Sequence, residues 1–498
     1  MEKTRKENRG KQLWDVYRVP FLSAFLFGLL AYGFLLANKI PVDDDLPFFF
    51  GKGATTISGR WGLALLRFVM PDLSLPWFYG LLSLLFLSLA ACLIVGIFRL
   101  KHPALQIVLC GLFVCFPAET GTISYTFTSA PYALALLLAI ASVAAFQRGK
   151  RWRYLAAPAL LLFSCSIYQG YFAFAASFCL ILLIQRLLRE EEDTATVVRE
   201  GLAMLLMLVL AAGGYGLSML LQQRLLHLPA LTADVVNTRQ SLPMRAAVAY
   251  SAFLHILTRG YFGYVRGRLS LVLHAAGILL VLAELFLRTR QQKLSRRLLC
   301  LLALVLLPLA VDCLYLLADT GFIHSLALYS FCSVYVLTAV VLDGGAGEGA
   351  RLPRRFAVLV MALVLAGNVY FANAFSLCSY LEYENAKSFY TELMVRAQQT
   401  PGFTQNSRLA LIGEPGEQYI NQRQDFDFGN FTLPGNNIRR SVHAQELMRL
   451  YIGWDVPFAG EEELAALRGS QALAAMPCYP YEGSVRMDGD VLIVKLSD

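Results

Sequence analysis

Charged residues are scarce in this sequence. They make up 16% of the 498 residues, whereas an ordinary soluble domain carries about a quarter. Hydrophobic residues make up 57% of the chain, and the mean hydropathy is +0.54. A chain with so few charges cannot cover the surface of a water-soluble fold of this size. The composition therefore indicates a polytopic α-helical membrane protein.

Signatures of several enzyme classes are also missing. No Walker motif, G-x-G-x-x-G, H-E-x-x-H or G-x-S-x-G occurs in a supporting context, and no internal repeat is visible. No C-x-x-C pair or Cys/His spacing suggests a metal site. The basic residues behind the net charge of +8 lie between apolar runs rather than in one cluster, so nucleic acid is not expected as a partner. The first apolar run is too long for a cleavable signal peptide.

Cysteine usage agrees with a membrane protein. Eight of the ten cysteines lie in or beside apolar segments, where they serve as small packing residues. Cys378 and Cys478 lie elsewhere, on the expected outer side of the membrane. A disulfide between them and two free thiols are both compatible with the sequence.

The apolar residues fall into runs that can cross a bilayer. A hydrocarbon core of about 30 Å requires about 20 helical residues. The stretch 154–187 is too long for one span and short for two, so a pair of short, broken helices is expected there. Eleven spans are expected, near 17–37, 77–98, 104–118, 126–146, 154–166, 168–187, 199–221, 269–287, 297–318, 323–342 and 356–377.

Lysine and arginine are distributed unevenly between the loops. The short loops near 117–126, 164–169 and 318–322 contain neither residue. The positive-inside rule therefore predicts a cytoplasmic N-terminus. It also predicts that the segments 38–76 and 222–268 and the C-terminal region lie outside the cytoplasm. Basic residues gather at the N-terminus and near 98–102, 147–153, 185–193, 288–297 and 351–355.

The composition changes near residue 380. Two earlier outer segments, 59–70 and 245–268, are expected to be helices lying in the membrane interface. The chain is thus divided into a membrane domain, 1–379, with outer loops 38–76 and 222–268, and a small extracytoplasmic α/β domain, 380–498. In the latter we expect a strand at 407–415, helices at 444–454 and 460–470, and a hairpin at 484–498.

Three consecutive aspartates, Asp43, Asp44 and Asp45, follow the first apolar run. Neighbouring carboxylates disfavour one another's ionised form, so one of them is a candidate base. The alternative is a solvated acidic turn after a helix end. The expected topology places these residues at the depth of the lipid headgroups.

Basic and acidic residues nearby extend this candidate site. Arg60 opens the interfacial segment "GRWGLALLRFVM" and is a candidate for binding a phosphate, as is Lys52 more weakly. The alternative for Arg60 is ordinary contact with lipid headgroups. Glu119 is the one ionisable residue in its expected short outer loop at 117–126, where it is either functional or simply exposed.

Aromatic and polar residues near the outer ends of the spans complete the set. Tyr125 is either an anchor at the membrane interface or a residue that stacks on a sugar. Tyr168 and Gln169 lie between two short apolar segments, where polar groups either line a cavity or bond between helices. Arg239 and Arg245 in the outer segment could bind a phosphate or anchor the chain at the membrane surface.

These motifs, in this order and spacing, resemble the Gtr II type of bacterial glucosyltransferases, the serotype-converting enzymes that modify O-antigen. The matching residues are Asp43-Asp44-Asp45, Gly59-Arg60-Trp61, Pro117 with Glu119 and Tyr125, and Tyr168-Gln169. The resemblance covers roughly residues 15–380. It implies a GT-C class glycosyltransferase in the bacterial inner membrane that moves one sugar, glucose, from a polyprenyl-phosphate carrier to a cell-surface or lipid-linked glycan on the outer face.

The residues are chemically compatible with that reaction. A lipid phosphate leaves without a proton donor, so a base for the acceptor hydroxyl and cations for the phosphate are sufficient. Asp44 is favoured as the base, with Asp43 as the close alternative and Asp45 or Glu119 orienting the acceptor or the sugar. A divalent ion bridging the aspartates and a phosphate is an alternative, but no further ligands are evident, so no cofactor is expected.

Two other functions are also compatible with these residues. A transporter or flippase for a lipid-linked sugar also needs polar residues near the headgroups, although transporters generally place theirs near the midplane. A polysaccharide ligase or polymerase would share the carrier lipid but transfer a whole glycan. The candidate residues lie on one side of the membrane, which favours a transferase.

Overall fold

The structure is a computed structural model, and it places most of the chain in helices. By contacts it divides into two units. Unit 1 comprises the described residues of 2–38 and 53–373, and unit 2 those of 39–51, 374–415 and 441–498. The structure describes residues 2–41, 43–51, 53, 55, 58–149, 152–189, 191–227, 240–259, 268–317, 325–344, 351–415 and 441–498.

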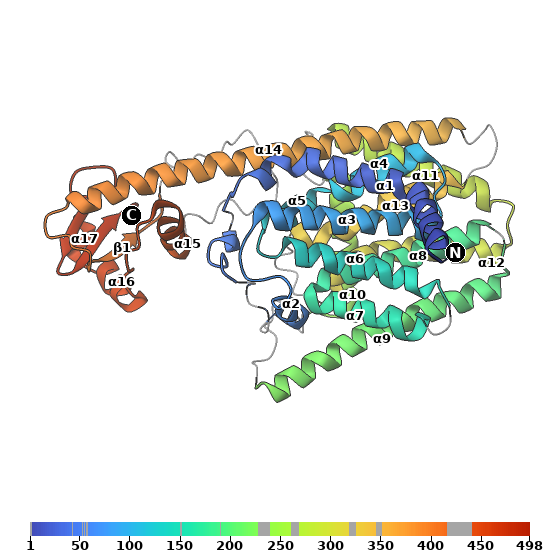
Figure 1. The fold of residues 1–498 in the computed structure, drawn as a ribbon, viewed down its shortest axis with the longest axis horizontal. Coiled ribbons are helices and arrows are strands. Elements are labelled where there is room, and N and C mark those ends of the chain that lie inside the picture. The colour runs from blue at the N-terminus through green and yellow to red at the C-terminus, as the bar shows by residue number, and fades with distance from the viewer. Residues whose placement is uncertain are drawn as a thin grey trace. The chain divides into compact units, whose positions relative to one another are not determined.

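Unit 1 is a bundle of helices. Helix α3 packs against both α1 and α6, and α6 packs in turn against α7 and α8, so these helices run side by side (Figure 1). Proline occupies the first position of α3, α4 and α5, where its missing N–H costs no helical hydrogen bond. The helices are α1 (Glu2–Ala37), α2 (Trp61–Leu66), α3 (Pro76–Phe98), α4 (Pro103–Val114), α5 (Pro117–Ser124), α6 (Ser129–Phe146), α7 (Ala157–Ile167), α8 (Phe172–Arg189), α9 (Thr194–Leu225), α10 (Leu242–Arg259), α11 (Arg268–Thr289), α12 (Leu294–Val311), α13 (Ser333–Asp343) and α14 (Arg351–Gln399).

Eight helices of the described chain are long and apolar enough to cross a membrane, and a bent pair, α4 with α5, adds a ninth. The expected count of eleven is therefore not confirmed, although a polytopic helical membrane protein is. The two further expected spans correspond to the shorter apolar helices Trp152–Ile167 and Leu328–Asp343. A helix of 16 residues is about 24 Å long, which is less than the hydrocarbon thickness.

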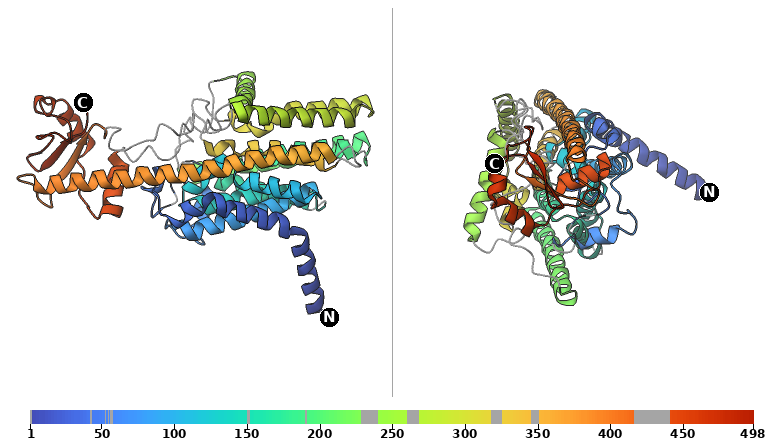
Figure 2. Two further views of the ribbon diagram at one scale, coloured as in Figure 1. Left: turned by 90° about the horizontal axis from the view of Figure 1, so that it is seen from above. Right: turned by 90° about the vertical axis from the view of Figure 1, so that its left-hand side faces the viewer.

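Several helices are bent or interrupted. Pro20 lies inside α1, where a proline removes one backbone hydrogen bond. The first turns of α1 point away from the bundle (Figure 2). The stretch 154–187 forms two short helices, α7 and α8, separated by the 3₁₀ turn η3 (Gln169–Tyr171), as expected from its length. Helices α4 and α5 meet at 46°. These breaks put polar residues inside unit 1.

Unit 2 contains a three-stranded sheet in the order β1-β3-β2. Strand β1 (Arg408–Ile412) pairs in parallel with β3 (Val491–Lys495), and β2 (Val485–Asp488) pairs with β3 in antiparallel. The last pair is the expected hairpin, with Gly489 at a positive φ in its turn. Short helices α15 (Ser441–Leu447), η8 (Met448–Ile452), α16 (Glu461–Arg468) and α17 (Gln471–Ala474) connect β1 to β2.

The sheet of unit 2 has a small apolar core. Its members are buried and come from the sheet and from the helices that connect its strands. Helix α14 contributes to unit 2 from Ala374 onward. Cys378 and Cys478, both in unit 2, are not joined in a disulfide, so of the two expectations the pair of thiols is the one found. The core residues are Ala410, Ile412, Ala459, Leu464, Leu473, Met476, Val491 and Ile493.

Candidate functional site

The three aspartates belong to unit 2, where they form the 3₁₀ turn η1 (Asp43–Asp45). Asp45 is fully buried and forms an ion pair with Lys39. The Lys39 ammonium also lies 5.2 Å from the centre of the Phe49 ring. Asp44, in contrast, is exposed. Asp44 and Asp45 are thus not equivalent, because Asp45 is buried in an ion pair and Asp44 is exposed.

Asp45 also interacts with the C-terminal part of unit 2. Burial, and then the charge of Asp45, raise the pKa of the Tyr451 hydroxyl well above its ordinary value. Tyr451 is in η8 and meets the ring of Tyr383 edge-on, with 5.2 Å between ring centres. The acidic turn therefore lies within electrostatic reach of a residue more than 400 positions later in the chain.

Arg60 belongs to unit 1, where two tyrosines hold its guanidinium group. Nη1 donates a hydrogen bond of 2.8 Å to the Tyr132 hydroxyl. The guanidinium carbon lies 5.8 Å from the centre of the Tyr132 ring and 5.4 Å from that of Tyr168. These two rings stack on each other with centres 4.5 Å apart. A cation over aromatic faces is electrostatically stabilised, so Arg60 is fixed in one orientation.

The backbone before Arg60 is fastened to other helices. Gln169 Nε2 donates to the Ser58 carbonyl at 2.7 Å and to the Tyr215 hydroxyl at 2.8 Å. The Tyr215 hydroxyl, from α9, donates to the Gly59 carbonyl at 3.1 Å. After the loop, Trp61 Nε1 donates to Ser218 Oγ on α9 at 3.0 Å. Gln169 and α9 therefore position the loop that carries Arg60.

Gly59 is required by this arrangement. Its φ is +74°, and a Cβ there would lie 2.7 Å from the Tyr215 hydroxyl oxygen. We expect Gly59→Ala to destabilise the loop by about 1–2 kcal/mol from the left-handed backbone alone, and to displace Arg60. The midpoint of thermal unfolding of the detergent-solubilised protein should fall, and so should its transferase activity. Gly216→Ala, at a helical glycine of α9 with open space around it, is the matched control and should be neutral or stabilising. Equal behaviour of the two variants would contradict the role given to Gly59.

Glu119 lies inside unit 1, in a buried helix and not in an exposed loop as expected. The residue is in the first turn of helix α5 and is fully buried. Pro117 starts this helix, because its fixed φ favours the first helical position. Neither Glu119 carboxylate oxygen has a hydrogen-bond partner among the described residues, and the same holds for the hydroxyl of Thr120.

Tyrosines surround Glu119. The hydroxyl groups of Tyr32, Tyr171 and Tyr329 lie within electrostatic reach of its carboxyl group. Two of these hydroxyls bond to carbonyls at the end of α4: Tyr32 donates to Val114 at 2.9 Å and Tyr329 to Phe113 at 2.5 Å. The break between α4 and α5 frees those carbonyls from helical bonding. The tyrosines thus stabilise the break that places Glu119 in the interior.

Aromatic rings in contact extend from Arg60 through Tyr168 to Tyr171. Tyr168, next to the Arg60 guanidinium, meets Tyr171 with ring centres 5.0 Å apart. Tyr171 in turn interacts with the Glu119 charge. The structure therefore brings together four of the residues predicted from sequence: Arg60, Glu119, Tyr168 and Gln169. Tyr32 and Tyr329 are additional members that sequence reasoning missed, because isolated tyrosines in apolar runs carry no local signal.

The other predicted residues have different surroundings. Tyr125 is buried and meets Phe127 edge-on, with 6.0 Å between ring centres. Arg245 donates to the backbone carbonyls of Gln240 at 2.9 Å and Leu316 at 2.8 Å, bonds that hold α10 in place. Lys52 and Arg239 lie outside the described residues. No group of three His, Cys, Asp or Glu side chains that could hold a metal ion is found where the structure describes the chain.

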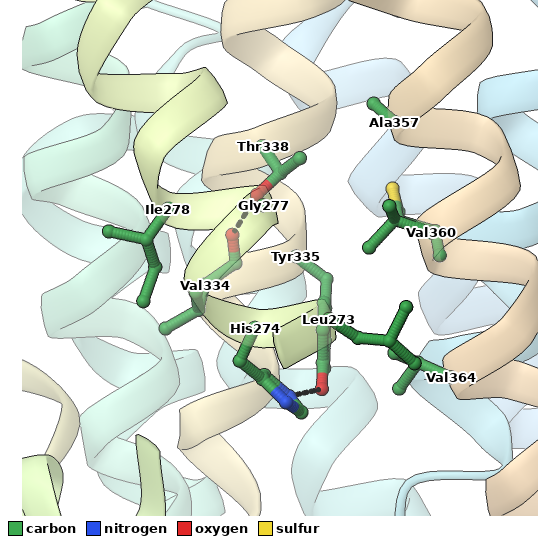
Figure 3. A pocket seen from close by; sticks show the side chains of 11 residues that line it. Leu273, His274, Gly277, Ile278, Val334, Tyr335, Thr338, Ala357, Val360 and Val364 are labelled. Atoms are coloured by element: carbon green, nitrogen blue, oxygen red, sulfur yellow. Dashed lines mark hydrogen bonds between the residues drawn. The ribbon is translucent and has the colours of Figure 1, made fainter. Parts of the chain in front are cut away.

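A small cavity lies between α11, α13 and α14 (Figure 3). Its volume is about 30 Å³, enough for a water molecule or two. Its polar edge is a hydrogen bond of 2.8 Å between His274 Nε2 and the Tyr335 hydroxyl, which face each other in Figure 3. The cavity shares no residue with the Arg60 and Glu119 groups, and it is too small for a sugar.

Comparison with known proteins identifies the family. Residues 33–342, more than half of the chain, match the family described as Glucosyl transferase GtrII. The matched region contains the acidic turn, Arg60, Glu119, Tyr168 and Gln169, and it ends before α14 and the sheet of unit 2. No curated protein and no solved structure matches the chain. The chain belongs to the GtrII glucosyl transferase family and is a membrane glycosyltransferase.

Proposed function

We propose that this glycosyltransferase takes a single glucose from a polyprenyl-phosphate carrier and passes it to a cell-surface or lipid-linked glycan at the outer face of the bacterial inner membrane. The observation that carries the proposal is the fixed guanidinium of Arg60 over Tyr132 and Tyr168. A guanidinium group recognises phosphate oxygens in a planar, two-point geometry. A cation held at the end of membrane helices suits a phosphate that is attached to a lipid.

The distribution of charge supports the outer face. Tyr132 lies in the first turn of α6, and Gln169 precedes α8. The basic loops 147–153 and 185–193 follow the opposite ends of these two helices. Under the positive-inside rule the basic ends are cytoplasmic. The Arg60 and Glu119 groups are then on the outer side.

The proposed chemistry is an inverting displacement at the anomeric carbon. The acceptor hydroxyl oxygen forms the new bond as the bond to the carrier phosphate breaks, and the carrier leaves as polyprenyl phosphate. Asp44 takes the proton of the acceptor hydroxyl, with Asp43 as the alternative base. Arg60 stabilises the charge that develops on the phosphate. Glu119 is assigned to orienting the sugar or the acceptor, a role that requires its buried carboxyl group to become accessible when the substrates bind.

The test is direct transfer by the purified full-length protein. The protein is incubated with labelled polyprenyl-phosphate glucose and candidate acceptor glycans, and the glycans are analysed for added label. We expect a single labelled hexose on the acceptor, with inverted anomeric configuration. Movement of the intact lipid across vesicle membranes without transfer would indicate a transporter instead. Transfer of an oligosaccharide from an oligosaccharide-bearing carrier would indicate a ligase or polymerase.

Removal of the Arg60 side chain tests the phosphate contact. Arg60→Ala should raise the KM for the lipid donor by about 10- to 100-fold, because one charge-assisted contact is lost. Tyr132→Phe removes the hydroxyl that accepts the hydrogen bond from Arg60 but keeps the ring, and it measures how much of the effect comes from that positioning. Arg67→Ala, at an exposed arginine of the same segment that pairs with Asp72, is the control and should leave the donor KM unchanged. If Arg60→Ala keeps the wild-type KM for the donor, Arg60 holds the loop in place and does not bind the phosphate.

A further inference from the structure

A second polar cavity lies at the ends of α3, α6 and α8. Its volume is about 120 Å³, large enough for several water molecules and hence for a phosphate group. Three arginines, Arg99, Arg186 and Arg189, line it together with Glu191 and Glu192. None of these residues belongs to the Arg60 or Glu119 groups.

The charges around this cavity do not cancel. Arg186 pairs with Glu192 at 3.2 Å and with Glu200 at 3.5 Å. Arg99 and Arg189 are both exposed and form no ion pair within the described part of the chain. Glu191 is the one acidic lining residue left to balance these two guanidinium groups, so the cavity retains positive charge.

Capping of α3 does not explain Arg99. The last carbonyls of α3 already accept hydrogen bonds from glutamines: Gln147 Nε2 donates to Ile97 at 3.4 Å and Gln185 Nε2 to Phe98 at 2.7 Å. Arg99 has a left-handed backbone, with φ of 52°, a conformation that usually selects glycine at the end of a helix. An arginine in a strained position, with no capping bond from its side chain among the described residues, indicates a use for its guanidinium group.

The position of the cavity indicates the source of the ligand. Gln147 follows the last turn of α6, whereas Tyr132, which contacts Arg60, lies in the first turn of the same helix. Fifteen residues of helix correspond to about 22 Å, so the cavity and Arg60 lie near opposite ends of α6. Ile97 and Leu182 form an apolar wall beside the charged groups. A ligand that presents a phosphate next to a hydrocarbon chain fits both kinds of lining.

We propose that this cavity binds the phosphate of an anionic glycerophospholipid from the membrane leaflet opposite the Arg60 group. Arg99 and Arg189 supply charge-assisted hydrogen bonds to the phosphate oxygens. Arg186, held by its two glutamates, shapes the cavity. The proposal is independent of the sugar donor, because the two sites are at opposite ends of α6 and α8.

The test measures the thermal unfolding of the full-length protein in an uncharged detergent as ligand is titrated, since binding to the folded state raises the midpoint. The probes are dioctanoyl phosphatidylglycerol, dioctanoyl phosphatidylcholine and inorganic phosphate. The variants are Arg189→Gln, which alters only an exposed side chain at a helix end, and the double variant Arg99→Gln with Arg189→Gln. Arg148→Gln with Arg290→Gln removes the same charge from exposed arginines outside the cavity and is the matched control.

We expect phosphatidylglycerol to stabilise the wild-type protein and the control variant. In the double variant the apparent dissociation constant for phosphatidylglycerol should rise by about tenfold or more, with a smaller rise in Arg189→Gln. Equal stabilisation of the double variant and the control would overturn the proposal. If inorganic phosphate stabilises the wild-type protein as much as phosphatidylglycerol does, the ligand is a free anion. If phosphatidylcholine does so, the cavity does not recognise the charge of the lipid. Either result also overturns it.

Discussion

Replacing Asp44 by asparagine is expected to lower the turnover of glucosyl transfer by about 10²- to 10⁴-fold, the range that general-base catalysis contributes. Asparagine has nearly the same shape as aspartate but cannot accept the proton of the acceptor hydroxyl. Asp44 is exposed, and asparagine keeps the shape of the side chain, so the substitution should change the unfolding midpoint by little. The measurement is the initial rate of labelled glucose transfer at saturating donor and acceptor, with thermal unfolding recorded on the same preparations.

Two other substitutions separate catalysis from structure. Asp455→Asn, at another exposed aspartate of unit 2, is the control and should retain full activity. Asp45→Asn breaks the buried ion pair with Lys39, so it should lower the stability of unit 2, because a buried charge that loses its partner is costly. Full transfer by Asp44→Asn would remove Asp44 from the role of base, and Asp43→Asn would then be the variant to measure.

Replacing Glu119 by glutamine should lower the transferase activity without lowering the stability of the protein. An ionised carboxylate with no partner is expensive to bury, so a neutral amide of the same shape should not lower the unfolding midpoint. Transfer should nevertheless fall by about 100-fold, the cost of a misplaced reactant, because the carboxylate oxygens that orient the sugar or the acceptor are lost. Both quantities are measured on the purified variant.

Glu200 provides the contrasting case for Glu119. It is also largely buried, but it receives two hydrogen bonds from Arg153, at 2.8 Å and 2.7 Å. Glu200→Gln should therefore lower the unfolding midpoint while its activity per folded molecule stays near that of the wild type. If Glu119→Gln behaves in the same way, Glu119 is a structural residue and the proposed role is wrong.

The helical membrane class and most of the spans follow from sequence. Burial of backbone polar groups in hydrocarbon forces an apolar run of sufficient length to be helical, and this rule needs no knowledge of distant residues. The same local rule predicted the broken pair now seen as α7 and α8. The total count of eleven is not confirmed, because the helices Trp152–Ile167 and Leu328–Asp343 are shorter than the length needed to cross a membrane.

The position of Glu119 shows the limit of local reasoning. Its segment, "PAETGTIS", has few apolar residues and was predicted as an outer loop. The hydroxyl groups of Tyr32 and Tyr329 donate hydrogen bonds to the carbonyls freed at the end of α4. The segment therefore forms a buried helix and not an outer loop. Tyr329 is 216 residues from the carbonyl it bonds. No pattern within a short window encodes that contact.

The sequence by itself determined the membrane class, the hairpin of unit 2 and the types of residue available for chemistry, because transfer into hydrocarbon and turn formation depend on neighbouring residues. Only the tertiary structure decided which of those residues lie together. It separated the exposed Asp44 from the ion-paired Asp45, and it placed Arg60 against Tyr132, 72 residues away. The physical reason is that packing between helices depends on complementary side chains from distant segments, and that complementarity determines which polar groups are buried and what they contact.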